Sequence, residues 1–245
     1  KSWIRSPQSE SISPTRKPRL SSMEYNEVRQ IICMCTQSDD EINVELYQRL
    51  LNQHGDSYKS LHWGSVESQT LRFQIITEIG MKTGDSVLDV GCGLGDYYVW
   101  LNENKIKLNY CGLDVTPEMI LKAQSKYPDI PFICGTLFDR ESKISDTYDY
   151  TVASGLFTHR RNNPEKYMRQ TINELFSIAR IGCAFNSLSS RHTQQEEGEF
   201  YADPIKTMQY CRSLTPLVEL RDEYHRGDFT IYMLKEFANR DQVNK

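Results

Sequence analysis

The sequence predicts an α/β fold in which a seven-stranded, mostly parallel sheet lies between two layers of helices. From residue 86 onward, short apolar segments alternate with helical segments, a pattern typical of parallel strands joined by crossover helices. These strands carry few polar residues, as expected when helices cover both faces of a sheet. Near residue 225 the alternation ends in two apolar segments joined by a polar turn, which predicts one antiparallel strand near the C-terminus.

Seven segments fit strands by their length and apolar content. They are residues 86–90, 110–114, 131–134, 150–153, 183–188, 217–220 and 229–234. The turn around residues 225–228 joins the last two, so we expect the final strand to run antiparallel to its neighbour.

Helix starts are marked by a capping residue followed by Pro, which suits the first helical position because it lacks a backbone N–H. The pairs are Thr116-Pro117, Asn163-Pro164 and Asp203-Pro204. An earlier helix is predicted to begin after Ser65 and to end at Gly80. Further upstream, residues 23–51 show helical spacing of apolar residues, interrupted by an acidic break at 39–41.

Composition divides the chain into unequal parts. Residues 1–22 are rich in Ser and Pro and hold five basic residues against one acidic residue, a composition that cannot bury enough apolar surface to fold. We therefore expect a flexible linker or tail over 1–22, a helical cover or lid over 23–64, the α/β domain over 65–238 and a short tail over 239–245. The start at Lys1 also permits a module cut from a larger protein.

Charge and hydropathy exclude several classes of function. The 245 residues carry a net charge of −4, and the part after the basic tail is more acidic still, which argues against a nucleic-acid partner. No apolar run approaches the ~20 residues that span a bilayer, so no membrane association is predicted. Seven Cys with no C-x-x-C pair favour reduced thiols, a cytoplasmic location and no metal site.

The most informative segment, residues 87–95, reads VLDVGCGLG. A short apolar strand runs directly into Gly91, Gly93 and Gly95, and a helix follows. Glycines let the backbone turn sharply and approach a ligand, and the helix N-terminus presents free N–H groups. Such a turn at the carboxyl end of a parallel strand lines a cofactor crevice. Asp96 stands where the dinucleotide fingerprint has its third glycine. Together with the acid at Asp89, it disfavours NAD and favours a ligand with a cationic part.

An acid followed by G-x-G-x-G resembles the first motif of the class I S-adenosylmethionine-dependent methyltransferases, which have a Rossmann-like fold. The resemblance covers roughly residues 58–234. It implies S-adenosylmethionine (SAM) as cofactor and S-adenosylhomocysteine (SAH) as product. It also implies that Gly91, Cys92, Gly93 and Gly95 wrap the methionine end of SAM, while Asp89 orients its ammonium group.

The resemblance further implies adenosine contacts at the ends of the next two strands. Asp114, with Val115 beside it, falls where the family's second acid holds both ribose hydroxyls, and a carboxylate can accept both hydrogen bonds. After the third strand, Thr136 departs from the family's common acid for the adenine amino group. We therefore expect a hydroxyl or backbone contact at Thr136 and ring packing by Leu137, with Asp139 as an alternative acid.

The fourth strand runs into residues 154–159, which in the family lie beside the sulfonium and the acceptor. Ser154 and Gly155 are predicted to form the floor under the methyl donor. His159 lies just beyond and is the candidate general base, since a His tuned near neutral pH can take a proton from the acceptor. The alternative is a loop histidine that contacts nothing.

Two further segments are candidates for covering the site. Tyr58 and Trp63 precede the first core helix and could enclose the sulfonium by cation–π contact, or could serve ordinary packing. Arg72, on that helix, could reach a carboxylate or be structural. The polar, acidic segment 187–203 is expected to face the acceptor, with a simple solvated loop as the alternative.

These features predict transfer of the SAM methyl group to a small-molecule acceptor in a biosynthetic pathway. Two alternatives remain. One is a non-catalytic scaffold with this fold, and the other is a methyltransferase acting on RNA or protein, to which only the basic tail points. The sequence determines neither the acceptor, nor the choice among O-, N- and C-methylation, nor the oligomeric state.

Overall fold

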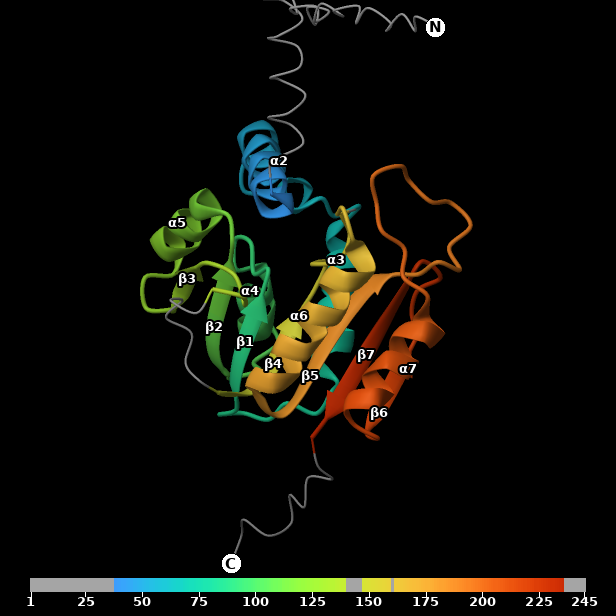
Figure 1. Cartoon of the computed structure of the whole chain (residues 1–245). Coiled ribbons are helices and arrows are strands. Elements are labelled where there is room, and N and C mark those ends of the chain that lie inside the picture. The colour runs from blue at the N-terminus through green and yellow to red at the C-terminus, as the bar shows by residue number, and fades with distance from the viewer. Residues whose placement is uncertain (1–37, 140–146, 160, 236–245) are drawn as a thin grey trace, which may run out of the picture. The chain divides into compact units, whose positions relative to one another are not determined.

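The computed structural model describes residues 38–139, 147–159 and 161–235 (Figure 1). The predictions for the tail at 1–22, for a helix before residue 38 and for the tail at 239–245 lie outside these residues. No helix in the described ranges is both long and apolar enough to cross a membrane.

The predicted seven-stranded sheet is present, in the order β3-β2-β1-β4-β5-β7-β6. Its strands are β1 (Ser86–Val90), β2 (Asn109–Asp114), β3 (Phe132–Cys134), β4 (Tyr148–Ala153), β5 (Ala179–Leu188), β6 (Val218–Arg221) and β7 (Asp228–Leu234). The first five pair in parallel, whereas β7 lies between β5 and β6 and is antiparallel to both. The predicted fold class and the antiparallel last strand are confirmed.

The helices surround this sheet. They are α2 (Asp39–His54), α3 (Val66–Thr77), α4 (Asp96–Glu103), α5 (Pro117–Lys126), α6 (Pro164–Ile178) and α7 (Pro204–Leu214), with a short 3-10 helix, η1 (Tyr58–Leu61), between α2 and α3. The Ser65 hydroxyl accepts the Ser68 N–H at 3.1 Å and caps α3 as predicted. Asn163 and Asp203 cap α6 and α7 through their side chains, but the Thr116 side chain makes no capping bond to α5.

Several of the predicted boundaries were wrong: α3 ends at Thr77 rather than at Gly80, and two other differences have a clear physical reason. Residues 39–41 do not break a helix, because Asp39, Asp40 and Glu41 form the first turn of α2, where negative charge is favourable. Strand β5 begins at Ala179, four residues before the predicted start. A Cβ at Gly182 would lie 2.5 Å from the Met233 carbonyl oxygen, so close packing inside the sheet requires a glycine at this position of β5.

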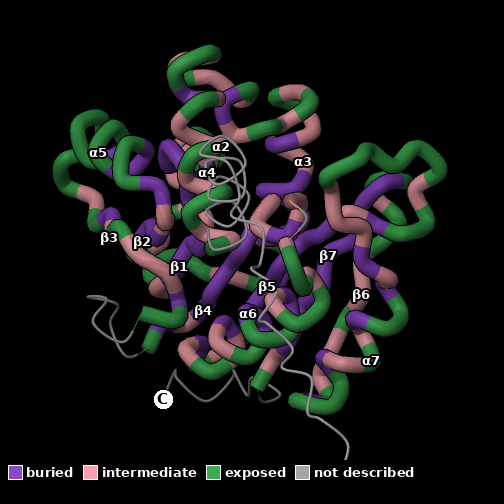
Figure 2. Tube along the Cα trace, turned by 45° about the horizontal axis from the view of Figure 1, so that its top comes forward, coloured by how far each residue is buried: buried purple, intermediate pink, exposed green. Residues whose placement is uncertain are grey.

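Alternate residues of the strands pack into two separate hydrophobic cores, one on each face of the sheet. On one face, Val87 and Tyr150 pack with α3, α4 and α5; on the other, Leu88 and Phe185 pack with α6 and α7. Figure 1 shows these helix layers on opposite sides of the strands, and in Figure 2 the buried part of the trace follows the central strands. The parallel strands β1 to β5 end at one edge of the sheet, where ligand sites of such folds form.

Candidate active site

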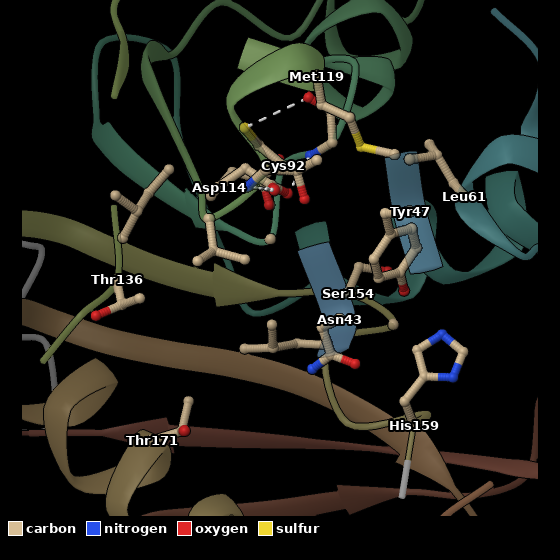
Figure 3. Close-up of a pocket in the computed structure, with 18 of the residues that line it drawn as sticks. Asn43, Tyr47, Leu61, Cys92, Asp114, Met119, Thr136, Ser154, His159 and Thr171 are labelled. Carbon is tan, nitrogen blue, oxygen red and sulfur yellow. Dashed lines mark hydrogen bonds between the residues drawn. The ribbon is translucent and has the colours of Figure 1, made fainter. Parts of the chain in front are cut away.

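A cavity lies at this edge, below α2 and at the ends of β1, β2 and β4 (Figure 3). Twelve of the predicted site residues line it: Trp63, Asp89, Gly91, Cys92, Gly93, Asp114, Val115, Thr136, Leu137, Ser154, Gly155 and His159. Tyr58 and Gly95 are not among the lining residues, and neither is the alternative acid Asp139. Residues far apart in the sequence thus share one cavity, as the predicted cofactor site requires.

The glycine turn is held by the end of β2. The N–H groups of Gly91 and Cys92 both donate to the Leu113 carbonyl, at 2.8 and 3.1 Å. The Asp114 carboxylate accepts the Gly93 N–H at 2.9 Å with one oxygen and the Thr116 N–H at 2.8 Å with the other. Burial raises the pKa of Asp114, while these backbone donors oppose the rise. Each oxygen keeps a lone pair that a ligand hydroxyl can use.

Glycine is required where this turn approaches other elements. Gly93 has φ +55°, and a Cβ there would lie 2.5 Å from a methyl carbon of Leu61, so η1 packs directly on the turn. Gly95 has φ +83° and is the N-cap residue of α4, with the Phe132 ring 2.9 Å from the position of a Cβ. Gly95 therefore shapes the turn from outside the cavity.

Asp89 is a buried acid below the turn. It is 3% exposed, and its carboxylate accepts the Tyr110 hydroxyl at 2.7 Å. Burial raises its pKa to about 7, opposed by the Tyr110 hydrogen bond and increased by the nearby carboxylates Asp114 and Asp96. A cationic group in the cavity would be stabilised by all three acids.

The turn after β4 is fixed from both sides. The buried Asn186 side chain accepts the Gly155 N–H at 2.8 Å and donates to the Ser154 hydroxyl at 3.0 Å. On the other side, a Cβ at Gly155 would lie 3.0 Å from the Trp63 ring, and Gly155 has φ +76°. These contacts give Ser154, Gly155 and Trp63 defined positions in the cavity wall.

His159 lines the cavity, but its pKa lies below the near-neutral value that we expected from the sequence. Burial, with smaller contributions from His62 and Arg161, lowers its pKa to about 4. Its Nε2 is buried without a hydrogen-bond partner in the described part of the chain. The ring lies 5.1 Å from that of His62 and 5.4 Å from that of Tyr47. The imidazole is therefore neutral at pH 7.

Helix α2 lies within residues 23–64, which the sequence predicts to form a cover or lid, but none of its residues is among the predicted site residues. Asn43 and Tyr47 project from it into the cavity between Cys92 and His159 (Figure 3). An ion pair between the Asp40 carboxylate and the Arg161 guanidinium, 2.7 Å apart, connects the start of α2 to the segment after β4. Asn43 and Tyr47 come from a helix without a recognisable motif, and its buried Leu51 reflects the packing of α2 against the rest of the domain.

Two more groups that sequence reasoning missed line the cavity. The Gln69 amide on α3 donates to the Asp96 carboxylate at 2.9 Å, which joins α3 to the first turn of α4. The Arg161 guanidinium lies 3.7 Å from the centre of the Tyr167 ring on α6. The spacing of residues in the sequence predicts neither pair, because each pair joins two separate elements.

The acidic segment 187–203 is not part of this cavity. Its later residues Phe200 to Asp203, with Ser190, line a second cavity against α6 and α7. The segment nevertheless pairs with the end of the cavity, because Glu199 forms a β-bridge with His159 and the Phe200 N–H donates to the Thr158 carbonyl at 2.8 Å. That it faces the acceptor stays a prediction.

The comparisons with known proteins agree with this geometry. Residues 87–182, which include the glycine turn, match the family described as "Methyltransferase domain". The protein named "Putative methyltransferase Rv1506c" of Mycobacterium tuberculosis is 32% identical over 160 residues, which are 61% of this chain and 93% of that protein. The chain belongs to the class I S-adenosylmethionine-dependent methyltransferases.

Solved structures show the same fold. The magnesium protoporphyrin IX methyltransferase of Synechocystis PCC 6803, with bound SAM, superposes with a TM-score of 0.58 at 14% identity, covering 82% of this methyltransferase and 99% of that chain. The plantazolicin methyltransferase BamL, in complex with SAH, gives 0.54 at 15% identity over 80% and 96%. The [4+2]-cyclase SpnF gives 0.56 at 13% identity over 75% and 73%.

The residues of this methyltransferase fit SAM. The sulfonium and ammonium of SAM are cationic, and Asp89, Asp96 and Asp114 all line the cavity. Gly91 and Gly93 allow Leu156 and Leu61 to pack directly on the glycine turn, because a Cβ at either position would lie 3.1 or 2.5 Å from these side chains. The Asp114 carboxylate is held by backbone N–H groups in one orientation. The site therefore suits a cationic ligand that also carries hydroxyls.

Proposed function

We propose that this methyltransferase transfers the SAM methyl group to a small-molecule acceptor, as part of a biosynthetic pathway. The supporting observation is the wall that α2 adds to the cavity. Tyr47 contacts the His159 ring edge to face, Asn43 lines the same cavity, and the Asp40–Arg161 ion pair joins α2 to the segment after β4. An acceptor that reaches the methyl group here has to fit beneath a helix, which favours a small molecule over a segment of RNA or protein.

The proposed cofactor contacts follow the lining residues. Bound SAM supplies an electrophilic methyl group on a sulfonium, and SAH leaves after transfer. Asp114 would hold the ribose hydroxyls, Asp89 the ammonium, and Thr136 with Leu137 the adenine, while Trp63 and Gly155 would flank the sulfur. Since methyl transfer is an in-line displacement, positioning supplies much of the rate.

His159 is the proposed contact to the acceptor. Its buried Nε2 has no partner among the described residues, so an acceptor hydroxyl or amine can fill that vacant hydrogen bond. The neutral imidazole is available as a proton acceptor at pH 7, and binding of a polar acceptor would relieve part of the desolvation that lowers its pKa. We also propose a cytoplasmic location, which the free thiols of the described cysteines support.

The test uses methyl-labelled SAM with a mixture of small nucleophiles, total RNA and total protein. We expect label in the small-molecule fraction, separated from the cofactor by chromatography. Label confined to RNA or protein would contradict the proposal, and absence of label with every acceptor, despite SAH binding, would favour the non-catalytic scaffold. His159→Gln should lower turnover at least about tenfold while SAH affinity, measured by calorimetry, stays unchanged.

A further inference from the structure

We propose that Asp228 and Arg72 are positioning residues of this methyltransferase, which hold Trp63 against the Gly155 turn and so fix one wall of the cofactor cavity. The inference depends on SAM binding and not on the identity of the acceptor. It gives a role at the site to the antiparallel strand β7, which contributes no residue to the lining of the cavity.

The first step is a buried ion pair between distant elements. Asp228 is the first residue of β7, and its side chain is 2% exposed; Arg72 lies on α3, and its side chain is 8% exposed. The Arg72 guanidinium donates to the Asp228 carboxylate and, through its other terminal nitrogen, to the Ser68 carbonyl at 2.7 Å. The guanidinium therefore has partners that fix both its position and its plane.

The second step connects this guanidinium to the cavity. Its central carbon lies 5.1 Å from the centre of the Trp63 ring, within the range of a cation–π contact. Trp63 lines the cavity and packs on Gly155, where a side chain would come within 3.0 Å of the indole. The series Asp228, Arg72, Trp63 and Gly155 thus joins β7 to the turn after β4.

The opposite side of the same turn is held by the strand beside β7. Asn186 of β5 binds both residues of the turn, and it pairs in register with Thr230 of β7. Two residues along, Leu188 pairs with Asp228. The β5–β7 pair therefore contacts the Gly155 turn directly through Asn186. It contacts the turn indirectly through Asp228, by way of Arg72 and Trp63.

The chemistry of the pair argues for positioning rather than stability alone. Apolar residues of similar volume can replace a buried ion pair without loss of stability, so stability does not require Arg and Asp here. A planar, always charged guanidinium that is fixed by a carboxylate stacks on an indole face in one orientation, and Lys cannot do so.

The experiment measures SAH affinity and the fluorescence of Trp63 in the same variants. Trp3 and Trp100 are replaced by Phe so that Trp63 is the only reporter. We expect Asp228→Asn and Arg72→Lys each to weaken SAH binding about tenfold, the size typical of coupled neighbours. We also expect each to shift Trp63 emission to longer wavelength. In a separate Trp63→Phe variant, which retains Trp100, adding Asp228→Asn should weaken binding no further.

Asp222→Asn is the matched control. Asp222 also pairs with an arginine, Arg191, at 2.8 Å, and lies in the hairpin turn that leads to Asp228, but both side chains are exposed. It should change neither affinity nor emission. Asp228→Asn that lowers the melting temperature but leaves affinity and emission unchanged would overturn the inference, as would additive losses of affinity from Asp228→Asn and Trp63→Phe. Failure of the wild type itself to bind SAH would instead contradict the cofactor assignment.

Discussion

The Asp114 carboxylate accepts the Gly93 backbone N–H at 2.9 Å, so the end of β2 fixes the turn that follows β1. The two motifs assigned to opposite ends of the cofactor are therefore one hydrogen-bonded unit before any ligand binds. A carboxylate already oriented by backbone donors loses little conformational entropy when it accepts ribose hydroxyls.

Two replacements of Asp114 distinguish the contribution of its charge to SAH affinity from the contribution of its hydrogen bonds. Asp114→Ala should weaken SAH binding at least about tenfold, because it removes the ribose acceptor and leaves the Gly93 and Thr116 N–H groups without it. Asp114→Asn should lose less, since its amide oxygen can accept one of these bonds. Isothermal calorimetry measures both. Asp129→Asn, an exposed acid outside the cavity, should match the wild type, and equal affinity of Asp114→Ala and wild type would rule out the ribose assignment.

Cofactor affinity should depend on pH through Asp89. Its pKa is about 7 in the protein without ligand, and a cationic ammonium binds the ionised form. Affinity for SAH should therefore be constant above pH 8 and fall below pH 7, by at most about tenfold per pH unit. Calorimetry between pH 5.5 and 8.5 tests this. Asp89→Asn should bind more weakly at pH 8 and show a flatter profile, whereas identical pH profiles for the two proteins would exclude Asp89 as the titrating group.

The same raised pKa has the opposite effect on the stability of the protein without ligand. The pKa of Asp89 rises from about 3.9 in the unfolded chain to about 7 in the folded protein. The folded form thus binds the proton more tightly, and stability falls as pH rises from 4 to 7, by about 4 kcal/mol at most. Asp89→Asn should melt at a higher temperature than wild type at pH 8 and close to it at pH 4. A melting difference independent of pH would contradict this linkage.

The Asn186 amide should matter for both stability and binding. Asn186→Ala leaves the Gly155 N–H without its acceptor in a buried setting, which costs about 1–3 kcal/mol. We expect a lower melting temperature and weaker SAH binding, because the turn beside Trp63 is no longer fixed. Ser154→Ala, which removes only the Asn186 donor bond at 3.0 Å, is the milder comparison. Thermal unfolding and calorimetry should rank the wild type, Ser154→Ala and Asn186→Ala in that order.

The sequence predicted those parts of the site that lie within one strand–turn–helix unit. β1 matches its predicted range, and the turn after it carries its own signal in Asp89 and three glycines. Asp114 was predicted through the resemblance, which places the family's second acid at the end of the second strand, and it does end β2 at the same edge of the sheet. Both acids thus lie on strands that a local pattern indicates.

Contacts between distant elements could not be predicted in this way. Asn43 and Tyr47 reach the cavity only because α2 crosses the sheet edge, and no local pattern shows where a separate helix packs. Arg161 was missed because its partner Asp40 lies 121 residues earlier. The displaced pKa of His159 likewise depends on burial by neighbours that the sequence does not place together.

The position of β7 has a consequence for how this protein folds. β7 is the last strand to be synthesised, yet it lies between β5 and β6 in the sheet. Arg72 of α3 binds Asp228 of β7 across a sequence separation of 156 residues. Contacts of high sequence separation form slowly because loop closure is costly. We therefore expect the glycine turn to acquire its native shape early, and the wall formed by Trp63 to mature in a late folding step.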